Sequence, residues 1–122
     1  MLHLHPRTAY YWYQGAADMR KSFDGLCGIV RQQMNLDVVS GAVFIFMNRK
    51  RNQVKLLTWE GDGLSIYYKR LEKGVYEAPV WQDGVHPCVQ MDMLQLQLIL
   101  QGVETGSIRK KKRFALPAHT NS

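Results

Sequence analysis

The clearest hydrophobic pattern in the chain predicts three short strands joined by two polar turns. Residues 42–47 are all apolar, which is typical of a strand that is covered on both faces at the centre of a sheet. Residues 53–59 and 64–71 divide between two faces, as half-buried strands do. The turns between them, 48–52 and 60–63, contain the asparagines and glycines that tight turns favour. The pattern therefore predicts an antiparallel β-meander.

An amphipathic helix is predicted ahead of this meander. Ser22 is a suitable N-cap, and Asp18 is the alternative one turn earlier. Gly25 and Gly28 weaken such a helix by up to about 1 kcal/mol each relative to alanine, and would allow close packing on the sheet. The apolar residues that follow at helical spacing are Phe23, Leu26, Cys27, Val30 and Met34.

Residues 92–102 carry two competing patterns. Leucines at every second position from Leu94 to Leu100 favour a strand. The abundance of leucine, methionine and glutamine favours a helix that Asp92 caps and Gly102 ends. We predict a helix, because Met93, Leu96, Leu100 and Val103 have near-helical spacing. Leucines left exposed on so short a helix would suit a protein partner.

Near the N-terminus, residues 8–13 are rich in aromatic side chains and are bounded by Pro6 and Gly15, which predicts a further strand. These aromatics either pack in the core or form a platform on which bases stack. Core packing is the favoured interpretation because it is the commonest use of aromatic side chains.

Length and composition indicate one folded unit. The chain has 122 residues, of which 46% are hydrophobic, enough for a single core. We predict an α+β domain over residues 1–108: an antiparallel β-meander sheet with one amphipathic helix packed on it and a second C-terminal helix. Residues 109–122 are expected to be a flexible basic tail. No stretch suits a bilayer and the start does not resemble a secretory signal, so we expect a cytoplasmic protein with no membrane contact.

The formal charge of +6 comes mainly from that tail. Five of the 16 basic residues lie together there, namely Arg109, Lys110, Lys111, Lys112 and Arg113. Without them 11 basic residues stand against 10 acidic ones, so the body of the domain is nearly neutral. Any claim of nucleic-acid binding must therefore depend on where the cations lie.

The sequence contains no recognised catalytic or metal-binding motif. DNA transfer by two metal ions needs a cluster of carboxylates, but Asp18 and Asp24 flank a predicted helix start, and others belong to the 60–63 turn. Cys27 and Cys88 are far apart, and the histidines are scattered. We therefore expect no catalytic residue, no metal and no cofactor.

Cations gather at one end of the predicted meander. Because consecutive strands reverse direction, the 48–52 turn and the region near 72–74 lie at the same end, and the acidic 60–63 turn lies at the other. This arrangement brings six cations to one rim: Arg49, Lys50, Arg51, Lys69, Arg70 and Lys73. Phosphate contacts there would be salt-dependent and would read little sequence. The simpler interpretation is a solvated turn that protects sheet edges from aggregation.

Further residues extend the candidate nucleic-acid-binding set. Tyr67 lies beside Lys69 on one strand face, where it could stack on an unpaired base. Arg20 and Lys21 precede a helix start, whose free N–H groups would also attract a phosphate, although both side chains could equally be solvated. The cations at 109–113 complete the set.

Three pieces of the sequence, in order, resemble a known family. They are DMRKSFDGL, SGAVFIFMNRKRNQVKLLTWEGDGLSIYYKRLEKG, and the later Pro79 and Trp81. Over about residues 18–81 the chain resembles the accessory protein encoded by the second reading frame of bacterial insertion sequence family sixty-six. That protein is often labelled TnpB but is unrelated to the RNA-guided nuclease with the same label. The resemblance implies a small protein needed for transposition, without agreed catalytic residues, since strand transfer is credited to a separate transposase.

The resemblance and the cation pattern together predict a noncatalytic accessory factor for DNA transposition that contacts element DNA through the basic rim. The alternative is a protein-interaction module that docks onto the transposase of the same element without binding DNA directly. Clustered cations favour the first function, and hydrophobic residues displayed on short elements favour the second.

Overall fold

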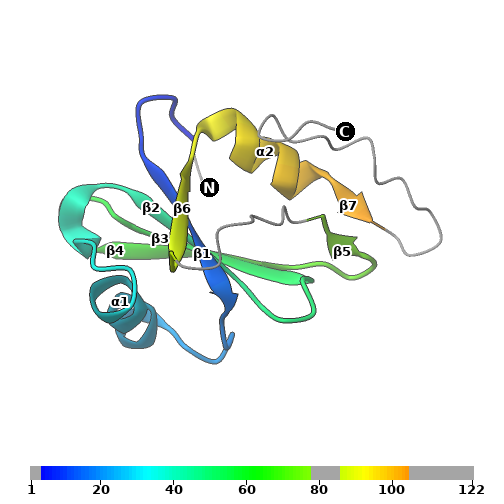
Figure 1. Ribbon diagram of the computed structural model, residues 1–122, viewed down its shortest axis with the longest axis horizontal. Coiled ribbons are helices and arrows are strands. Elements are labelled where there is room, and N and C mark those ends of the chain that lie inside the picture. The colour runs from blue at the N-terminus through cyan, green and yellow to red at the C-terminus, as the bar shows by residue number, and fades with distance from the viewer. Residues whose placement is uncertain (1–3, 78–85, 105–122) are drawn as a thin grey trace.

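A five-stranded sheet lies between two helices that cover its opposite faces (Figure 1). The computed structural model describes residues 4–77 and 86–104. A separate two-stranded sheet pairs β5 with β7. The elements in chain order are β1 (Tyr10–Ala16), α1 (Phe23–Gln32), the short 3₁₀ helix η1 (Val38–Ser40), β2 (Val43–Met47), β3 (Gln53–Trp59), β4 (Leu64–Arg70), β5 (Val75–Tyr76), β6 (Cys88–Met91), α2 (Met93–Gln101) and β7 (Val103–Glu104).

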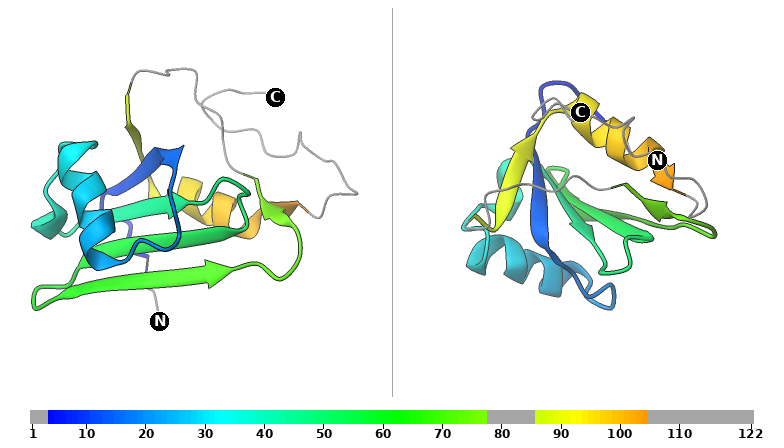
Figure 2. Two further views of the ribbon diagram at one scale, coloured as in Figure 1. Left: turned by 90° about the horizontal axis from the view of Figure 1, so that it is seen from below. Right: turned by 45° about the vertical axis from the view of Figure 1, so that its right-hand side comes forward.

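The predicted meander is confirmed. Strands β2, β3 and β4 are consecutive antiparallel neighbours, with Val43 opposite Thr58 and Gln53 opposite Arg70. All five residues of β2 are buried, as its apolar sequence predicts for a central strand. The second and third strands of the meander extend side by side in Figure 2.

The sheet as a whole is mixed, so the prediction of a purely antiparallel sheet was wrong. Its strand order is β4-β3-β2-β1-β6, and β1 runs parallel to β2 and antiparallel to β6. The reason is the helix between β1 and β2. A crossover through α1 returns the chain to the end of the sheet where β1 began, and the next strand then runs in the same direction.

Strand β1 uses its aromatic side chains for packing. Tyr10 and Trp12 are buried on the face that α2 covers. On the other face Tyr11 stacks on Phe44, with 5.8 Å between the ring centroids. Tyr13 contacts Phe46 of β2 in a tilted arrangement, with an interplanar angle of 49°, and its hydroxyl donates to Gln33 of the segment after α1. These contacts support the core interpretation of residues 8–13 over the stacking platform.

Helix α1 packs on the Phe44 face of the sheet through Leu26, Cys27, Ile29 and Val30. Ser22 occupies the N-cap position, as predicted, but its side chain makes no capping hydrogen bond. Phe23, predicted on the apolar face, is 42% exposed.

Helix α2 resolves the ambiguous leucine segment in favour of the predicted helix. The Asp92 carboxylate accepts a hydrogen bond from Gln95 N at 2.8 Å, and Gln95 Oε1 accepts one from Asp92 N at 3.0 Å. This reciprocal capping satisfies two N–H groups of the first turn. Leu96 and Ile99 enter the core, whereas Leu94 and Leu98 are exposed.

No helix in the described ranges is both long enough and apolar enough to cross a membrane. The predicted tail, 109–122, lies outside the described residues, as do Pro79 and Trp81.

Candidate nucleic-acid interface

The turn between β2 and β3 is built by its two asparagines. Asn48 Oδ1 accepts hydrogen bonds from Asn52 N at 3.0 Å and from Gln53 N at 2.9 Å, and Asn48 Nδ2 donates to Asn52 Oδ1 at 2.7 Å. Arg51 adopts the left-handed conformation, with φ of 61°. Because the asparagines hold the turn, the side chains of Arg49, Lys50 and Arg51 are not needed inside it, and all three residues are exposed.

This turn is hydrogen-bonded to the chain on both sides of the β4–β5 connection. The carbonyl of Arg51 accepts a hydrogen bond from Tyr76 N at 2.7 Å, and that of Asn52 accepts one from Leu71 N at 2.8 Å. The register also sets Arg70 opposite Gln53. The six cations predicted at one end of the meander therefore come from adjoining backbone segments. We call them the basic rim: Arg49, Lys50, Arg51, Lys69, Arg70 and Lys73.

Acidic side chains neutralise little of the rim. Arg70 Nη2 lies 3.6 Å from Glu72 Oε2, and both side chains are largely exposed. The other rim cations form no ion pair with a residue in the described ranges. Glu60 and Asp62 belong to the turn at the opposite end, where Trp59 pairs with Leu64. The separation of charge expected from the connectivity is present, and the binding role of these residues stays a prediction.

The two exposed tyrosines of β4 lie on opposite faces of the sheet. Tyr67 pairs with Leu56 of the core on the α2 side. Tyr68 pairs with Lys55 and lies on the α1 side of the sheet. Tyr67, the predicted stacking residue, is 37% exposed, whereas Tyr68 is 50% exposed.

A hollow of about 480 Å³ opens beside the rim on the α1 side. Arg49 and Lys50 line it from the β2–β3 turn, Arg20 from the segment before α1, and Tyr68 from β4. We call this the basic hollow. Arg20, predicted to lie with Lys21 at the helix start, lies beside the rim instead.

Arg20 is engaged by a neighbouring carboxylate. Its Nη2 lies 2.7 Å from Asp18 Oδ2, its Nε donates to both carboxylate oxygens, and its backbone N–H donates to Oδ1 at 2.9 Å. The hydrogen bonds from Arg20 hold the pKa of Asp18 well below its usual range, and the same pair raises the pKa of Arg20. Since Arg20 and Asp18 offset each other, the net charge of the hollow comes from Arg49 and Lys50.

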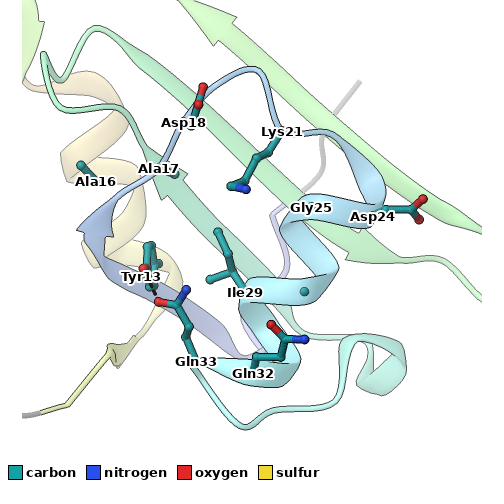
Figure 3. A pocket seen from close by; sticks show the side chains of 11 residues that line it. Tyr13, Ala16, Ala17, Asp18, Lys21, Asp24, Gly25, Ile29, Gln32 and Gln33 are labelled. Atoms are coloured by element: carbon teal, nitrogen blue, oxygen red, sulfur yellow. Dashed lines mark hydrogen bonds between the residues drawn. The ribbon is translucent and has the colours of Figure 1, made fainter.

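Lys21 faces a different cavity, of about 420 Å³, between β1 and α1. Figure 3 shows its ammonium directed into the space between Tyr13 and the helix, while Asp24 points away. The stem of Lys21 runs beside Gly25, where an added Cβ would lie only 3.0 Å from Lys21 Cβ and Cγ. The segment containing Asp18 separates this cavity from the basic hollow, because Asp18 lines both.

Lys55, which the sequence pattern did not single out, connects this segment to the sheet. The residue is only 6% exposed. Its ammonium donates to the carbonyls of Met19 at 3.0 Å and Lys21 at 2.7 Å, and lies 4.7 Å from the centroid of the Tyr68 ring. The available signal was a lysine at an inward position of a strand in the middle of the meander.

Burial is the main influence on both cysteine thiols of the described residues. Burial raises the pKa of both the Cys27 and the Cys88 thiol, which favours the neutral form. No group of three or more histidine, cysteine or acidic side chains within residues 4–77 and 86–104 is arranged to hold a metal ion.

The sequence of residues 8–110 matches the family described as IS66 Orf2 like protein. The chain belongs to this family. Its curated relatives include the uncharacterized proteins y4hO and y4jC of Sinorhizobium fredii (strain NBRC 101917 / NGR234). The first is 28% identical over 74% of this chain and 76% of the relative, and the second is 24% identical over 77% and 78%. No solved structure matches.

Membership in the IS66 Orf2-like family confirms the resemblance seen in the sequence and fits an accessory role in transposition. The matched range includes the rim, the basic hollow and both helices. Of the cations in the predicted tail it includes Arg109 and Lys110.

Proposed function

We propose that this protein is a noncatalytic accessory factor for DNA transposition and that it contacts DNA through the basic rim. The observation that carries the proposal is the hydrogen bond of 2.7 Å between Tyr76 N and the Arg51 carbonyl. It fixes the β4–β5 connection against the β2–β3 turn, at the end of the meander where the strand register already gathers the cations of both segments. Family membership supplies transposition as the setting.

The rim suits phosphate contacts better than base reading. Its cations lie on turns and at the end of an edge strand, with long exposed side chains. Such side chains can follow a phosphate backbone, and every neutralised phosphate releases counterions. Arg109, Lys110, Lys111, Lys112 and Arg113 lie outside the described residues and, in this proposal, add further phosphate contacts. Binding would therefore be strongly salt-dependent and would discriminate poorly among DNA sequences.

The noncatalytic part of the proposal is supported by the local uses of several carboxylates. Asp18 is paired with Arg20, Asp37 accepts a hydrogen bond from Val39 N in η1, and Asp92 caps α2. These uses explain the acidic residues without a reaction, and the chemistry of strand transfer is left to the transposase.

The test is a salt series on a DNA duplex with matched variants. In the rim variant, Arg49→Gln and Lys50→Gln are combined, and Arg51 is left unchanged so that the left-handed residue of the turn, with φ of 61°, stays as it is. The control combines Arg7→Gln with Arg31→Gln. Arg7 precedes β1 and Arg31 lies in the last turn of α1, both at the end of the sheet away from the rim.

The rim variant and the control each lose two positive charges, but from opposite ends of the sheet. If each rim cation contacts one phosphate, the rim variant lowers the slope of log K against log salt by about 1.8, and the control leaves it near the wild-type value. Equal slopes for both variants would contradict the rim as the contact surface, and absence of duplex binding by wild type at low salt would contradict the function itself.

A second candidate function has its own observation. Leu94 is 61% exposed and Leu98 is 40% exposed, and they lie one turn apart on α2. This pair would suit docking onto the transposase of the same element. The test is co-purification after nuclease digestion, comparing wild type with the Leu94→Ser/Leu98→Ser variant. Docking is supported if the wild-type protein retains the transposase and the variant loses it. Equal recovery of the transposase with wild type and with the variant would oppose docking.

A further inference from the structure

We propose that the basic hollow binds single-stranded DNA, with an unpaired base stacked on the Tyr68 ring and flanking phosphates held by Arg49, Lys50 and Arg20. This inference rests on the proposed function, which supplies DNA as the ligand. It specifies that the DNA is an unpaired strand and that this strand binds on the α1 side of the rim.

The Tyr68 ring is positioned before any ligand arrives. Its hydroxyl donates a hydrogen bond to Gln53 Oε1, and the Lys55 ammonium lies over the ring at 4.7 Å from the centroid. Lys55 is in turn fixed by two backbone carbonyls. A ring that is already held loses little conformational freedom when a base stacks on it.

Tyr68 also keeps a surface that a base can reach. It belongs to β4, the edge strand of the five-stranded sheet, and stays 50% exposed although Lys55 occupies one side of its ring. Aromatic rings beside a positive groove are the usual means by which proteins hold unpaired strands, because every base has a face that can stack.

The cations are placed to hold the phosphates on either side of that base. Arg49 and Lys50 line the same hollow as Tyr68 and form no ion pair with a described residue. Arg20 uses Nε and Nη2 for Asp18, and its Nη1 makes no hydrogen bond within the described ranges. Its side chain is 90% exposed, so a phosphate can approach it.

The wall of the hollow is anchored to the sheet. The segment carrying Arg20 is linked to β3 through the bonds from Lys55 to the Met19 and Lys21 carbonyls. The opposite side is the β2–β3 turn, which is fixed by the hydrogen bonds of Asn48. The site is therefore largely formed without DNA, as ligand sites usually are.

An intact duplex cannot use all of this site. Its bases are stacked on each other, so a duplex reaches the same cations only through its phosphates and leaves the Tyr68 ring without a partner. Stacking on Tyr68 therefore distinguishes single-stranded from duplex DNA, whereas contacts between the cations and phosphates do not.

The test compares a labelled thymidine oligomer of about 12 nucleotides, within the site sizes of single-strand binders, with a blunt duplex of the same length. The 122-residue chain carries Tyr68→Leu, which removes the aromatic face, or Tyr68→Phe, which keeps it. Tyr67→Leu is the matched control, because it changes the neighbouring tyrosine on the other face of the same strand. Thermal melting confirms that each variant is folded.

We expect Tyr68→Leu to weaken single-strand binding about tenfold and duplex binding less than about twofold. Tyr68→Phe and Tyr67→Leu should each stay within about twofold of wild type on both ligands. Unchanged single-strand affinity in Tyr68→Leu, or an equal loss on both ligands, would overturn the inference.

A measurement on the unmodified protein covers the case in which Tyr68→Leu does not fold. Photocrosslinking to an iodouracil-substituted single strand should attach at Tyr68, as located by mass spectrometry. Attachment confined to Tyr67 or to the aromatics of β1 would refute the site. If duplex binding follows the rim but crosslinking avoids Tyr68, only the inference fails. If neither DNA form binds, the proposed function fails with it.

Discussion

The Lys55 ammonium lies 4.7 Å from the centroid of the Tyr68 ring, with one residue buried in β3 and the other half exposed on the edge strand β4. The same ammonium donates to the carbonyls of Met19 and Lys21. One buried cation therefore holds both the segment before α1 and the aromatic ring of the proposed DNA site. Its hydrogen bonds satisfy a charge that would otherwise be costly to bury.

Replacing this cation with an apolar side chain of similar length should loosen the segment. We expect Lys55→Met to lower the free energy of unfolding by about 1–3 kcal/mol, because the two carbonyls lose their partner. Lys69→Met, at an exposed position of β4, should change it by less than about 0.5 kcal/mol. Urea denaturation measures both values. A Lys55→Met protein more stable than wild type would show that burying the ammonium costs more than its contacts return.

The two glycines of α1 should respond differently to alanine. An added Cβ at Gly28 meets nothing within 4 Å, so Gly28→Ala should stabilise the protein by about 0.5–1 kcal/mol through helix propensity alone. At Gly25 the new Cβ would lie 3.0 Å from two carbons of the Lys21 stem. Gly25→Ala should therefore yield a smaller gain or a loss. Equal stabilisation in urea denaturation would show that Lys21 moves aside freely.

Tyr76 carries a buried hydroxyl that makes no hydrogen bond to any residue within 4–77 and 86–104. Tyr76→Phe should raise the free energy of unfolding by about 1 kcal/mol, because it removes an unsatisfied polar group. The matched control is Tyr10→Phe. The Tyr10 hydroxyl donates to the His5 carbonyl at 2.9 Å and accepts from His5 N at 2.7 Å, so this variant should lose stability. Thermal or urea denaturation at neutral pH shows whether each variant gains or loses free energy of unfolding.

The buried Tyr76 side chain should make the stability of the folded protein depend on pH. Burial raises the pKa of Tyr76 above its ordinary value of 10.0. A group with a higher pKa in the folded state contributes stability that is complete below its unfolded pKa and is lost as the pH rises through its folded pKa. Wild type should therefore lose stability in alkaline solution above about pH 10, and Tyr76→Phe should lose less. Parallel alkaline unfolding curves for the two proteins would contradict this assignment.

Asp18 neutralises part of the positive charge of the basic hollow. Asp18→Asn keeps an oxygen that can accept from Arg20 N but removes the charge paired with the guanidinium. We expect DNA affinity at low salt to rise roughly two- to fivefold, the range that one exposed charge provides. Because the pKa of Asp18 is held far below its ordinary value, the gain should be the same across about pH 5–8. Fluorescence anisotropy measures it, and unchanged affinity would place the DNA elsewhere.

Local patterns in the sequence were sufficient for much of the fold. The apolar run of β2, the asparagine turn at residues 48–52 and the alternation in β4 each act over a few residues, and the meander followed from them. The second helix was predictable for the same reason, since Asp92 and Gln95 cap it within one turn. The clustering of Arg49–Arg51 with Arg70 needed only strand reversal.

Tertiary structure decided the features that depend on distant partners. The parallel pairing of β1 with β2 comes from the packing of α1 on the sheet, which the strand sequences do not encode individually. The separation of Arg20 from Lys21 and the choice of Tyr68 as the supported ring both depend on Lys55, which lies 34 residues beyond Lys21 in the chain. Composition and spacing established which cations the protein has and which turns carry them. Only the folded chain, by burying Lys55 against two carbonyls, determined which of those cations surround an exposed aromatic ring.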